Sequence, residues 1–381
     1  MLNLKNIRSI LSALLITILL TPSALASEPE PPEVEARAAI LMDADSGLVL
    51  FEKNADEPML IASTTKIMTA LLALERCDSD QTVVIDPAWT GIEGSTMYLE
   101  AGQEMTVREL LYGLMLASGN DAAVALACIA AGSVEAFVSL MNERAAALGC
   151  ENTHFENPNG LDGEAHYSSA RDMATITRDA IRNEGFCEIA STTTKAVGGH
   201  VFTNHNRLLT ECEGVFGVKT GYTEAAGRTL VTCCERNELR LICVTLSDPN
   251  DWCDHTNLYD WGYGSYFRDE LLQPPETVWS IPVIGGTADS VSVSPALPLT
   301  VLRRADQEVS VELRLPPFVY AEVESGAEAG QAAAVVDGSV TASVPLVFSE
   351  SVNERRGERI GFLDWLLRFI KQGERKIYSL S

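Results

Sequence analysis

The stretch from Leu60 to Leu74 constrains the fold more than any other, because it is patterned as a helix that is apolar on almost every side. Such a helix belongs in a protein interior. Ser63 stands at its start and Lys66 follows one turn later, so both side chains project from one face. Burial away from carboxylates lowers the pKa of a lysine, and a neutral Lys66 can act as a base for the Ser63 hydroxyl. The alternative interpretation is that Ser63 only caps the helix.

The first 26 residues have the pattern of a signal peptide. Lys5 and Arg8 give a basic start, residues 10–20 are apolar, and residues 24–26 (Ala-Leu-Ala) form a small-x-small cleavage site. The apolar run is short for a membrane span. We therefore expect an exported protein whose mature chain begins at Ser27. The alternative is an N-terminal anchor that is not cleaved.

Net charge restricts the class of partner, and the cysteines restrict the disulfides and metal sites that the chain can form. The formal net charge of the 381 residues is −25, which argues against nucleic acid as a partner. Nine cysteines follow the predicted signal peptide, and this odd number leaves at least one thiol unpaired within the chain. The sequence contains no Cys-x-x-Cys motif, and nothing in it calls for a metal or a cofactor. We expect most of the cysteines to serve as small buried hydrophobic residues.

The pattern up to about residue 272 predicts helices packed on one antiparallel sheet. This arrangement is an α+β unit, and it is expected to span residues 34–272. A hairpin is expected first, helices then fill the middle, and short turns separate the last strands. The expected strands are 38–43, 48–51, 215–220, 229–234 and 239–246, and the expected helices are 60–74, 106–117, 121–131, 133–149 and 169–182.

The character of the chain changes after Pro274-Pro275. Residues 276–350 contain short runs of alternating hydrophobicity, such as 290–293, 309–315 and 340–346. Strands at this spacing predict a small β-sandwich. The segment contains no cysteine or histidine, so we interpret it as a spacer or docking domain.

The tail, residues 357–376, is patterned as an amphipathic helix. Its apolar residues between 360 and 370 cover an arc of about 220° at about 100° per residue. Residues 353–376 contain seven Arg or Lys and four Asp or Glu, a net charge of +3 in an acidic chain. This pattern favours a helix that lies on an anionic membrane surface. The alternative is a helix that packs on the protein's own core.

Three short motifs occur in order along the chain. They are Ser63-Thr64-Thr65-Lys66 at a buried helix start, Ser118-Gly119-Asn120 in a turn between two apolar helices, and Lys219-Thr220-Gly221 at a strand end. Each motif is weak evidence alone. Together, in these local structures and behind an export signal, they predict one active site.

With these motifs, the chain resembles the serine-type D-alanyl-D-alanine carboxypeptidases, which are low-molecular-mass penicillin-binding proteins. The resemblance covers roughly residues 34–350 and includes the stretches 157–161, 167–173 and 203–206. It implies a penicillin-binding/β-lactamase-like domain of the α+β class, followed by the β-sandwich. It also implies an exported bacterial enzyme on the outer face of the cytoplasmic membrane.

The resemblance implies a role for each motif. Ser63 attacks the carbonyl between the two D-alanines of a peptidoglycan stem peptide, Lys66 is its general base, and Ser118 relays a proton to the leaving D-alanine. β-Lactam antibiotics are implied as covalent inhibitors of Ser63. The N–H groups of Ser63 and Tyr222 would form the oxyanion hole, and the substrate is held by Asn120, Lys219, Thr220, Gly221, Tyr222 and Thr223.

The chain departs from the family at one position. Some members have an arginine for the substrate carboxylate in the region of residues 251–255, where this chain has none. Arg228 is a possible substitute. His166, His205 and His255 are expected to have surface or hydrogen-bonding roles rather than to act as bases.

Three other functions use the same residues. A class A β-lactamase usually has Ser-Asp-Asn at the second motif and a Glu-x-x-Leu-Asn segment, and residues 150–175 contain no such segment. An endopeptidase acting on cross-links needs the same catalytic groups. An inert peptidoglycan-binding protein would be expected to have lost the nucleophile or the base, and both are present here.

Overall fold

The computed structural model describes residues 30–355 and 376–380. The predicted signal peptide, the cleavage site and Ser27 lie outside these ranges. The predicted tail helix at 357–376 also lies outside them, apart from Lys376, which begins a short strand.

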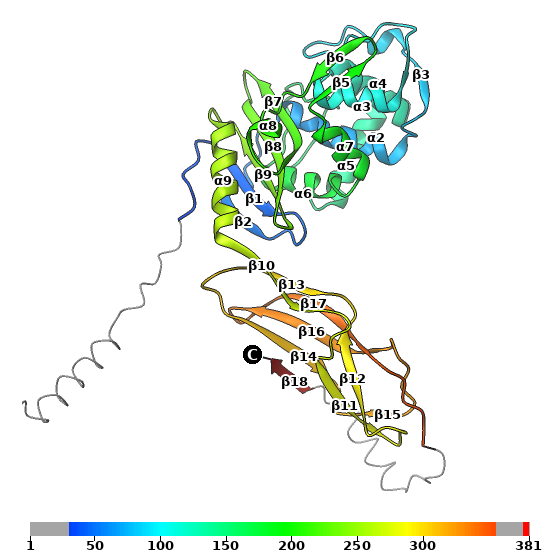
Figure 1. The fold of residues 1–381 in the computed structure, drawn as a ribbon. Coiled ribbons are helices and arrows are strands. Elements are labelled where there is room, and N and C mark those ends of the chain that lie inside the picture. The colour runs from blue at the N-terminus through cyan, green and yellow to red at the C-terminus, as the bar shows by residue number, and fades with distance from the viewer. Residues whose placement is uncertain (1–29, 356–375, 381) are drawn as a thin grey trace, which may run out of the picture.

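A five-stranded antiparallel sheet forms the centre of the first unit, in the order β2-β1-β9-β8-β7. All six residues of β1 are buried, because helices cover both faces of the sheet. Helix α9 covers one face, with the short α8 packed into the same hydrophobic cluster, and α6 packs on the opposite face with the remaining helices beyond it (Figure 1). The strands are β1 (Ala38–Asp43), β2 (Val49–Lys53), β7 (Val215–Thr223), β8 (Gly227–Arg236) and β9 (Leu239–Leu246).

Five helices lie where the apolar periodicity predicts them, although the one expected from residue 60 begins as a 3-10 turn and becomes α-helical only at Lys66. Three helices, α7, α8 and α9, were not predicted. The predicted capping box is present: the Thr106 side chain accepts from the Glu109 N–H, and the Glu109 carboxylate accepts from the Thr106 N–H. The helices are α2 (Lys66–Arg76), α3 (Val107–Leu116), α4 (Asn120–Ala131), α5 (Val134–Ala147), α6 (Ala170–Ala180), α7 (Glu184–Ser191), α8 (Leu208–Glu211) and α9 (Asp251–Ser265).

Two small hairpins and two 3-10 turns complete the first unit. The hairpins lie on the helical side of the molecule, away from α9 (Figure 1). They are β3 (Thr82–Val84) with β4 (Glu104–Thr106), and β5 (Thr194–Val197) with β6 (His200–Thr203); the 3-10 turns are η1 (Ala62–Thr65) and η2 (Pro87–Trp89).

The second unit is the predicted small β-sandwich. A two-stranded sheet and a seven-stranded sheet share one hydrophobic core. Strand β10 directly follows α9 and pairs with β13, so residues 266–272 hydrogen-bond to the second unit. The strands are β10 (Tyr266–Leu272), β11 (Trp279–Ile284), β12 (Ser290–Pro295), β13 (Leu299–Arg304), β14 (Val309–Leu315), β15 (Val319–Tyr320), β16 (Glu328–Val336), β17 (Ser339–Phe348) and β18 (Lys376–Leu380).

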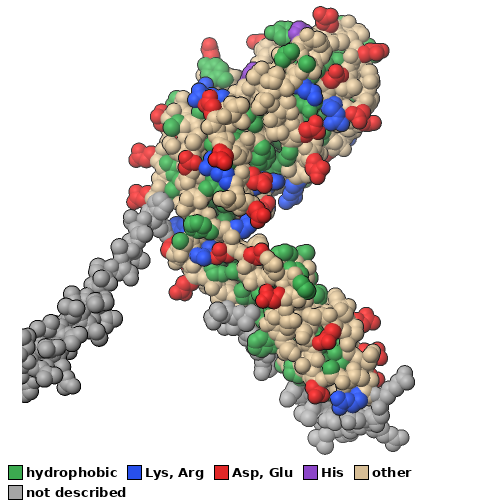
Figure 2. Space-filling model, viewed as in Figure 1, with side chains coloured by type: hydrophobic (Ala, Val, Ile, Leu, Met, Phe, Trp, Pro, Cys, Tyr) green, Lys and Arg blue, Asp and Glu red, His purple; other side chains and the backbone are tan. Residues whose placement is uncertain are grey.

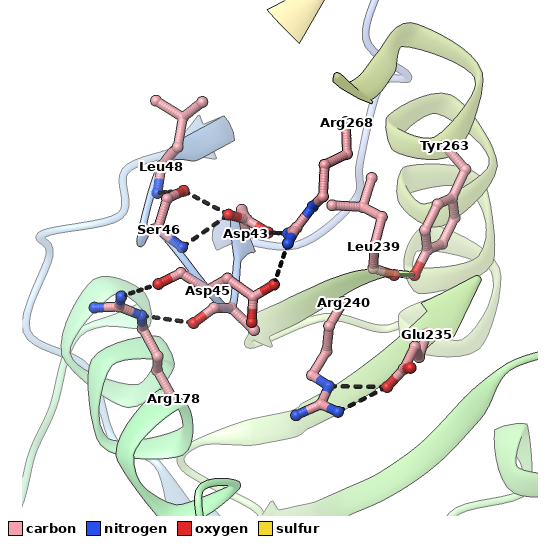
Figure 3. Close-up of polar contacts among 11 residues, drawn as sticks. Asp43, Asp45, Ser46, Leu48, Arg178, Glu235, Leu239, Arg240, Tyr263 and Arg268 are labelled. Atoms are coloured by element: carbon pink, nitrogen blue, oxygen red, sulfur yellow. Dashed lines mark hydrogen bonds and ion pairs between the residues drawn. The ribbon is translucent and has the colours of Figure 1, made fainter. Parts of the chain in front are cut away.

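An ion-pair cluster connects β10 to the first sheet. Arg268 donates from one guanidinium nitrogen to Asp43 at 3.2 Å and lies 2.6 Å from Asp45 through another. Asp43 ends β1 and Asp45 lies in the turn that follows it, and Figure 3 shows both facing Arg268. The side chain of Asp43 is only 1% exposed, so Arg268 supplies a positive charge to a buried carboxylate.

Acidic side chains are distributed over both units on the face shown in Figure 2, in keeping with the net charge. All nine cysteines are free, and most are wholly or partly buried, while Cys253 is exposed. No single helix in residues 30–355 is long and apolar enough to cross a membrane; α4 and α5 reach that length only as a pair bent by 83°.

Candidate active site

Lys66 lies in the interior and contacts three oxygens. Its side-chain nitrogen lies 2.9 Å from Ser63 Oγ, 2.8 Å from Asn120 Oδ1 and 2.5 Å from the backbone oxygen of Asn159. Lys66 is completely buried, and none of the three oxygens carries a formal charge. The structure therefore brings together the first and second motifs and leaves the lysine without a direct counter-ion.

Burial lowers the pKa of Lys66 well below its ordinary value. The positive charge of Lys219 lowers the pKa further, and the negative charge of Asp121 opposes both effects. A neutral amine has two N–H donors and one lone pair. The two donors match the oxygens of Asn120 and Asn159, and the lone pair is left for the hydroxyl proton of Ser63.

Ser63 is held in a tight turn between the sheet and α2. It belongs to η1, and the preceding residue Ala62 has a φ of +43°, which is uncommon for a side chain other than glycine. Two glycines allow the close approach: a Cβ on Gly160 would lie 1.9 Å from the Ala62 oxygen, and a Cβ on Gly221 would lie 2.9 Å from the Ser63 nitrogen. The backbone of β7 thus passes directly beside Ser63.

Ser118 lies in the break between α3 and α4, with a φ of +59°. Its hydroxyl oxygen is buried, and the described residues give it no hydrogen-bond partner. A buried unpaired hydroxyl is rare in proteins and suits a group that acts on a bound substrate. Asn120, two residues after Ser118, donates from its side-chain nitrogen to the backbone oxygen of Glu93 at 2.6 Å. This bond fixes the Asn120 side chain against Lys66.

The third motif lies on β7. Lys219 is buried and donates to the Thr220 oxygen at 2.9 Å, and burial lowers its pKa to about 7. Tyr222 is 66% exposed at the rim of the cavity. Neither Lys219 nor Thr223 is among the residues that line the cavity, and the Thr223 hydroxyl donates to Asp162 at 3.0 Å.

These groups surround a cavity of about 320 Å³. Arg228 lies at one end of it, directly across from Tyr222 in the β7–β8 register. Two hydrogen bonds join its guanidinium to Asp251, at 3.1 and 2.7 Å, and the Trp252 ring lies 5.2 Å away. The lining residues are Ser63, Ser95, Ser118, His205, Thr220, Gly221, Tyr222, Arg228, Asp251 and Trp252.

Two of the three histidines are buried hydrogen-bonding residues, as expected. His166 bonds Thr65 at 2.8 Å, and burial lowers its pKa to about 4. His255 bonds two threonines of the sheet, and burial lowers its pKa to about 3. His205 instead lines the cavity.

The sequence reasoning missed several residues of the site. Asn159 contacts Lys66 through its backbone oxygen, and the signals for it were the turn-forming residues of 157–160 and the family resemblance of the stretch 157–161. Ser95 was not predicted, and Asp251 and Trp252 were noted only as the region where some family members have an arginine; all three reach the cavity only through the tertiary fold.

The sequence matches the D-alanyl-D-alanine carboxypeptidase family model over residues 25–250. The chain belongs to this family. It is 34% identical to D-alanyl-D-alanine carboxypeptidase DacF of Bacillus subtilis, over 95% of this chain and 97% of that protein. It is also 34% identical to DacA of Escherichia coli K12, over 86% of each chain. Penicillin-binding protein 5 of Haemophilus influenzae superposes with a TM-score of 0.73 at 30% identity, covering 86% of this chain and all of that one.

Membership of the D-alanyl-D-alanine carboxypeptidase family confirms the expected fold and enzyme class. The fold is α+β, with a penicillin-binding domain and a β domain after it. The enzyme is a hydrolase, a serine-type D-Ala-D-Ala carboxypeptidase, and it acts outside the cytoplasm. The family does not assign roles to individual residues of this chain.

Proposed function

We propose that this enzyme removes the terminal D-alanine from peptidoglycan stem pentapeptides through an acyl-enzyme on Ser63. One observation supports this proposal above the others: a fully buried Lys66 contacts Ser63 Oγ at 2.9 Å and has only uncharged partners. A lysine in that setting is neutral at a pH where an exposed lysine is charged, so it can accept the serine proton.

In the acylation step, Ser63 Oγ attacks the carbonyl carbon while its proton passes to Lys66 Nζ. The carbonyl oxygen becomes negatively charged and accepts hydrogen bonds from the N–H groups of Ser63 and Tyr222. Ser118, whose hydroxyl has no other partner in the described residues, relays the proton: it takes one from the Lys66 ammonium as it gives its own to the departing amine, so Lys66 is neutral again. The C–N bond breaks, D-alanine leaves, and water then hydrolyses the Ser63 ester.

The free carboxylate of the substrate lies at the Arg228 end of the cavity. Thr220 and Arg228 line the cavity from β7 and β8, and the buried Lys219 lies behind Thr220 on β7, so the site has two positive charges for the carboxylate. Asp251 and Trp252 hold the Arg228 guanidinium in a fixed orientation. Thr223 stands at the edge of this set, with its hydroxyl already bound to Asp162.

β-Lactam antibiotics acylate the same serine, because their strained amide presents a carbonyl and a carboxylate in a similar arrangement. The test uses a fluorescent penicillin and a diacyl-L-Lys-D-Ala-D-Ala peptide. Wild type and Ser191→Ala, a control on distant α7, should label covalently and release D-alanine. Ser63→Ala should do neither, and labelling of Ser63→Ala would show that the nucleophile lies elsewhere.

We also propose that residues 34–272 are the catalytic domain, that 276–350 form a spacer, and that residues 357–376 attach the enzyme to an anionic membrane after export. The net charge of +3 over residues 353–376 supports this attachment in an otherwise acidic chain. Truncation after Arg356 should release the enzyme from vesicles that contain anionic lipid. Because this truncation also removes β18, a truncation that lacks only residues 376–381 is the matched control, and it should remain bound.

A further inference from the structure

A second hollow, of about 580 Å³, adjoins the cavity that contains Ser63. The two hollows share Ser95 and His205, so they form one continuous depression. None of the ten residues that line the second hollow is Asp, Glu, Lys or Arg. We call it the Tyr98 groove, after the residues that shape it: Ser95, Tyr98, His200, Val201, Phe202 and His205.

Exposed apolar side chains gather along this depression. Tyr98 is 61% exposed and Val201 is 70% exposed, and both line the Tyr98 groove. Tyr222, also exposed, lines the adjoining cavity. These are three of the nine exposed large hydrophobic residues in the described part of the chain. A grouping of this kind beside a catalytic serine marks a surface that binds a ligand.

Tyr98 points to the surface because its backbone adopts an energetically unfavourable conformation. Tyr98 has a φ of +66°, a conformation that is rare for a bulky residue and usually maintained by surrounding contacts. Here the contacts come from Asp121, whose buried carboxylate accepts from the N–H groups of Met97 and Leu99. Both of those side chains are buried, so the chain between them turns the Tyr98 ring to the surface.

The opposite wall of the groove orients the Tyr98 ring. The centroid of the Tyr98 ring lies 5.2 Å from that of the His200 ring. The His200 ring also stacks on Phe202, with a centroid distance of 6.0 Å. His200 and Phe202 belong to β6, so the stack connects the loop before α3 with the β5–β6 hairpin. An aromatic surface fixed in this way loses little conformational freedom when a ligand binds.

The direction of the substrate follows from the two ends of the depression, and this step rests on the proposed function. Arg228 and Trp252 line only the first cavity, whereas Ser95 and His205 lie where it opens into the Tyr98 groove. If the terminal carboxylate binds at Arg228, the rest of the stem peptide leaves Ser63 toward Ser95. The acyl side of the substrate is therefore directed into the groove.

We propose that the Tyr98 groove binds the part of the stem peptide that precedes the penultimate D-alanine. Tyr98 and Val201 contact its aliphatic and peptide groups, and because no lining residue is charged, recognition in the groove rests on these neutral contacts. Tyr98 is thus a specificity-determining residue: it selects long acyl chains but takes no part in the chemistry at Ser63.

The test compares two substrates that have the same scissile bond and no charge apart from the terminal carboxylate: diacetyl-L-Lys-D-Ala-D-Ala and N-acetyl-L-Ala-D-isoglutaminyl-Nε-acetyl-L-Lys-D-Ala-D-Ala. In wild type, kcat/KM should be about tenfold higher for the longer peptide. Tyr98→Ala and Val201→Ser should each reduce this preference by about fivefold and leave the short substrate and penicillin acylation unchanged. Tyr98→Phe should retain the preference, as should Leu297→Ala, a control residue that is 59% exposed in the β domain.

Provided that wild type hydrolyses the short substrate, two results would overturn the proposal. One is an unchanged preference for the longer peptide in both Tyr98→Ala and Val201→Ser; the other is an equal loss of kcat/KM on both substrates. A loss confined to substrates that carry the muramyl sugar would assign the groove to a saccharide and would likewise overturn it. If wild type releases no D-alanine from the short substrate, the proposed function itself is wrong, which is a separate outcome.

Discussion

The side-chain nitrogen of Lys66 and the hydroxyl oxygen of Ser63 lie 2.9 Å apart inside the protein, and the other partners of that nitrogen are the neutral oxygens of Asn120 and Asn159. In the proposed mechanism, this relationship makes the serine reactive without a histidine or a carboxylate. It also makes the chemistry dependent on the charge of two buried lysines, because Lys219 lowers the pKa of Lys66.

The first prediction concerns the pH dependence of acylation. Lys66 must be neutral and Lys219 must be charged, so the rate should rise through the lowered pKa of Lys66 and fall as Lys219 deprotonates above about pH 7. Lys219→Arg keeps a charge at all these pH values and should move the alkaline limb upward. Stopped-flow acylation by a penicillin measures both limbs. An acidic limb near about pH 4 would indicate a carboxylate base instead of Lys66.

The second prediction concerns stability. The folded-state pKa of Lys219 is about 7 and its ordinary value is 10.5, so between these values the unfolded chain binds more protons than the folded one. The free energy of unfolding should therefore rise with pH in this window, by at most about 1.4 kcal/mol per pH unit from this residue. Lys219→Met should remove that part of the slope. Urea titrations between about pH 7 and pH 9 under reducing conditions measure it, and equal slopes would show that Lys219 titrates normally.

The third prediction concerns Asp121. Its carboxylate accepts from the Thr96 hydroxyl at 2.6 Å and from the Met97 and Leu99 N–H groups at 3.0 and 3.1 Å. Asp121→Asn should lower the free energy of unfolding by about 1.5–3 kcal/mol, because a charged acceptor of several hydrogen bonds is lost in the interior. Acylation should slow as well, because the loop it holds carries Ser95.

The matched control for Asp121 is Asp86→Asn, which weakens an exposed helix cap on Ala88. Its effect should stay below about 1 kcal/mol. Thermal unfolding and the rate of penicillin labelling measure both variants. Equal losses of stability in the two variants would show that the buried hydrogen bonds of Asp121 contribute no more than an exposed cap.

The fourth prediction concerns the connection between the two units. Arg268→Met leaves the buried carboxylate of Asp43 without its cation and should lower stability by about 2–4 kcal/mol. Arg314→Met, which breaks an exposed pair with Glu312 at 3.7 Å, should change stability by less than about 1 kcal/mol. Denaturant unfolding compares the two variants, and a small effect of Arg268→Met would mean that the turn hydrogen bonds from Ser46 are sufficient for Asp43.

The sequence by itself determined the local elements and the order of the motifs. Helix α3 begins where Thr106 and Glu109 form a capping box, and it ends before the polar tripeptide at 118–120. The strands of the central sheet lie where alternating and apolar runs predict them, because periodicity and caps act within a few residues of chain. The same local signals predicted Ser63 and Lys66 on one helix face; in the structure Ser63 lies in the 3-10 turn η1 and α2 begins at Lys66, with the two side chains still in contact.

Only the tertiary structure decided which distant groups meet. The Asn159 oxygen reaches Lys66 across 93 residues, Asp251 reaches Arg228 across 23, and β10 pairs with β13 rather than with the sheet that precedes it. The outward turn of Tyr98 likewise depends on Asp121, which lies on another element. No periodicity encodes such contacts, because they depend on how whole elements pack and on which backbone groups are left to be satisfied.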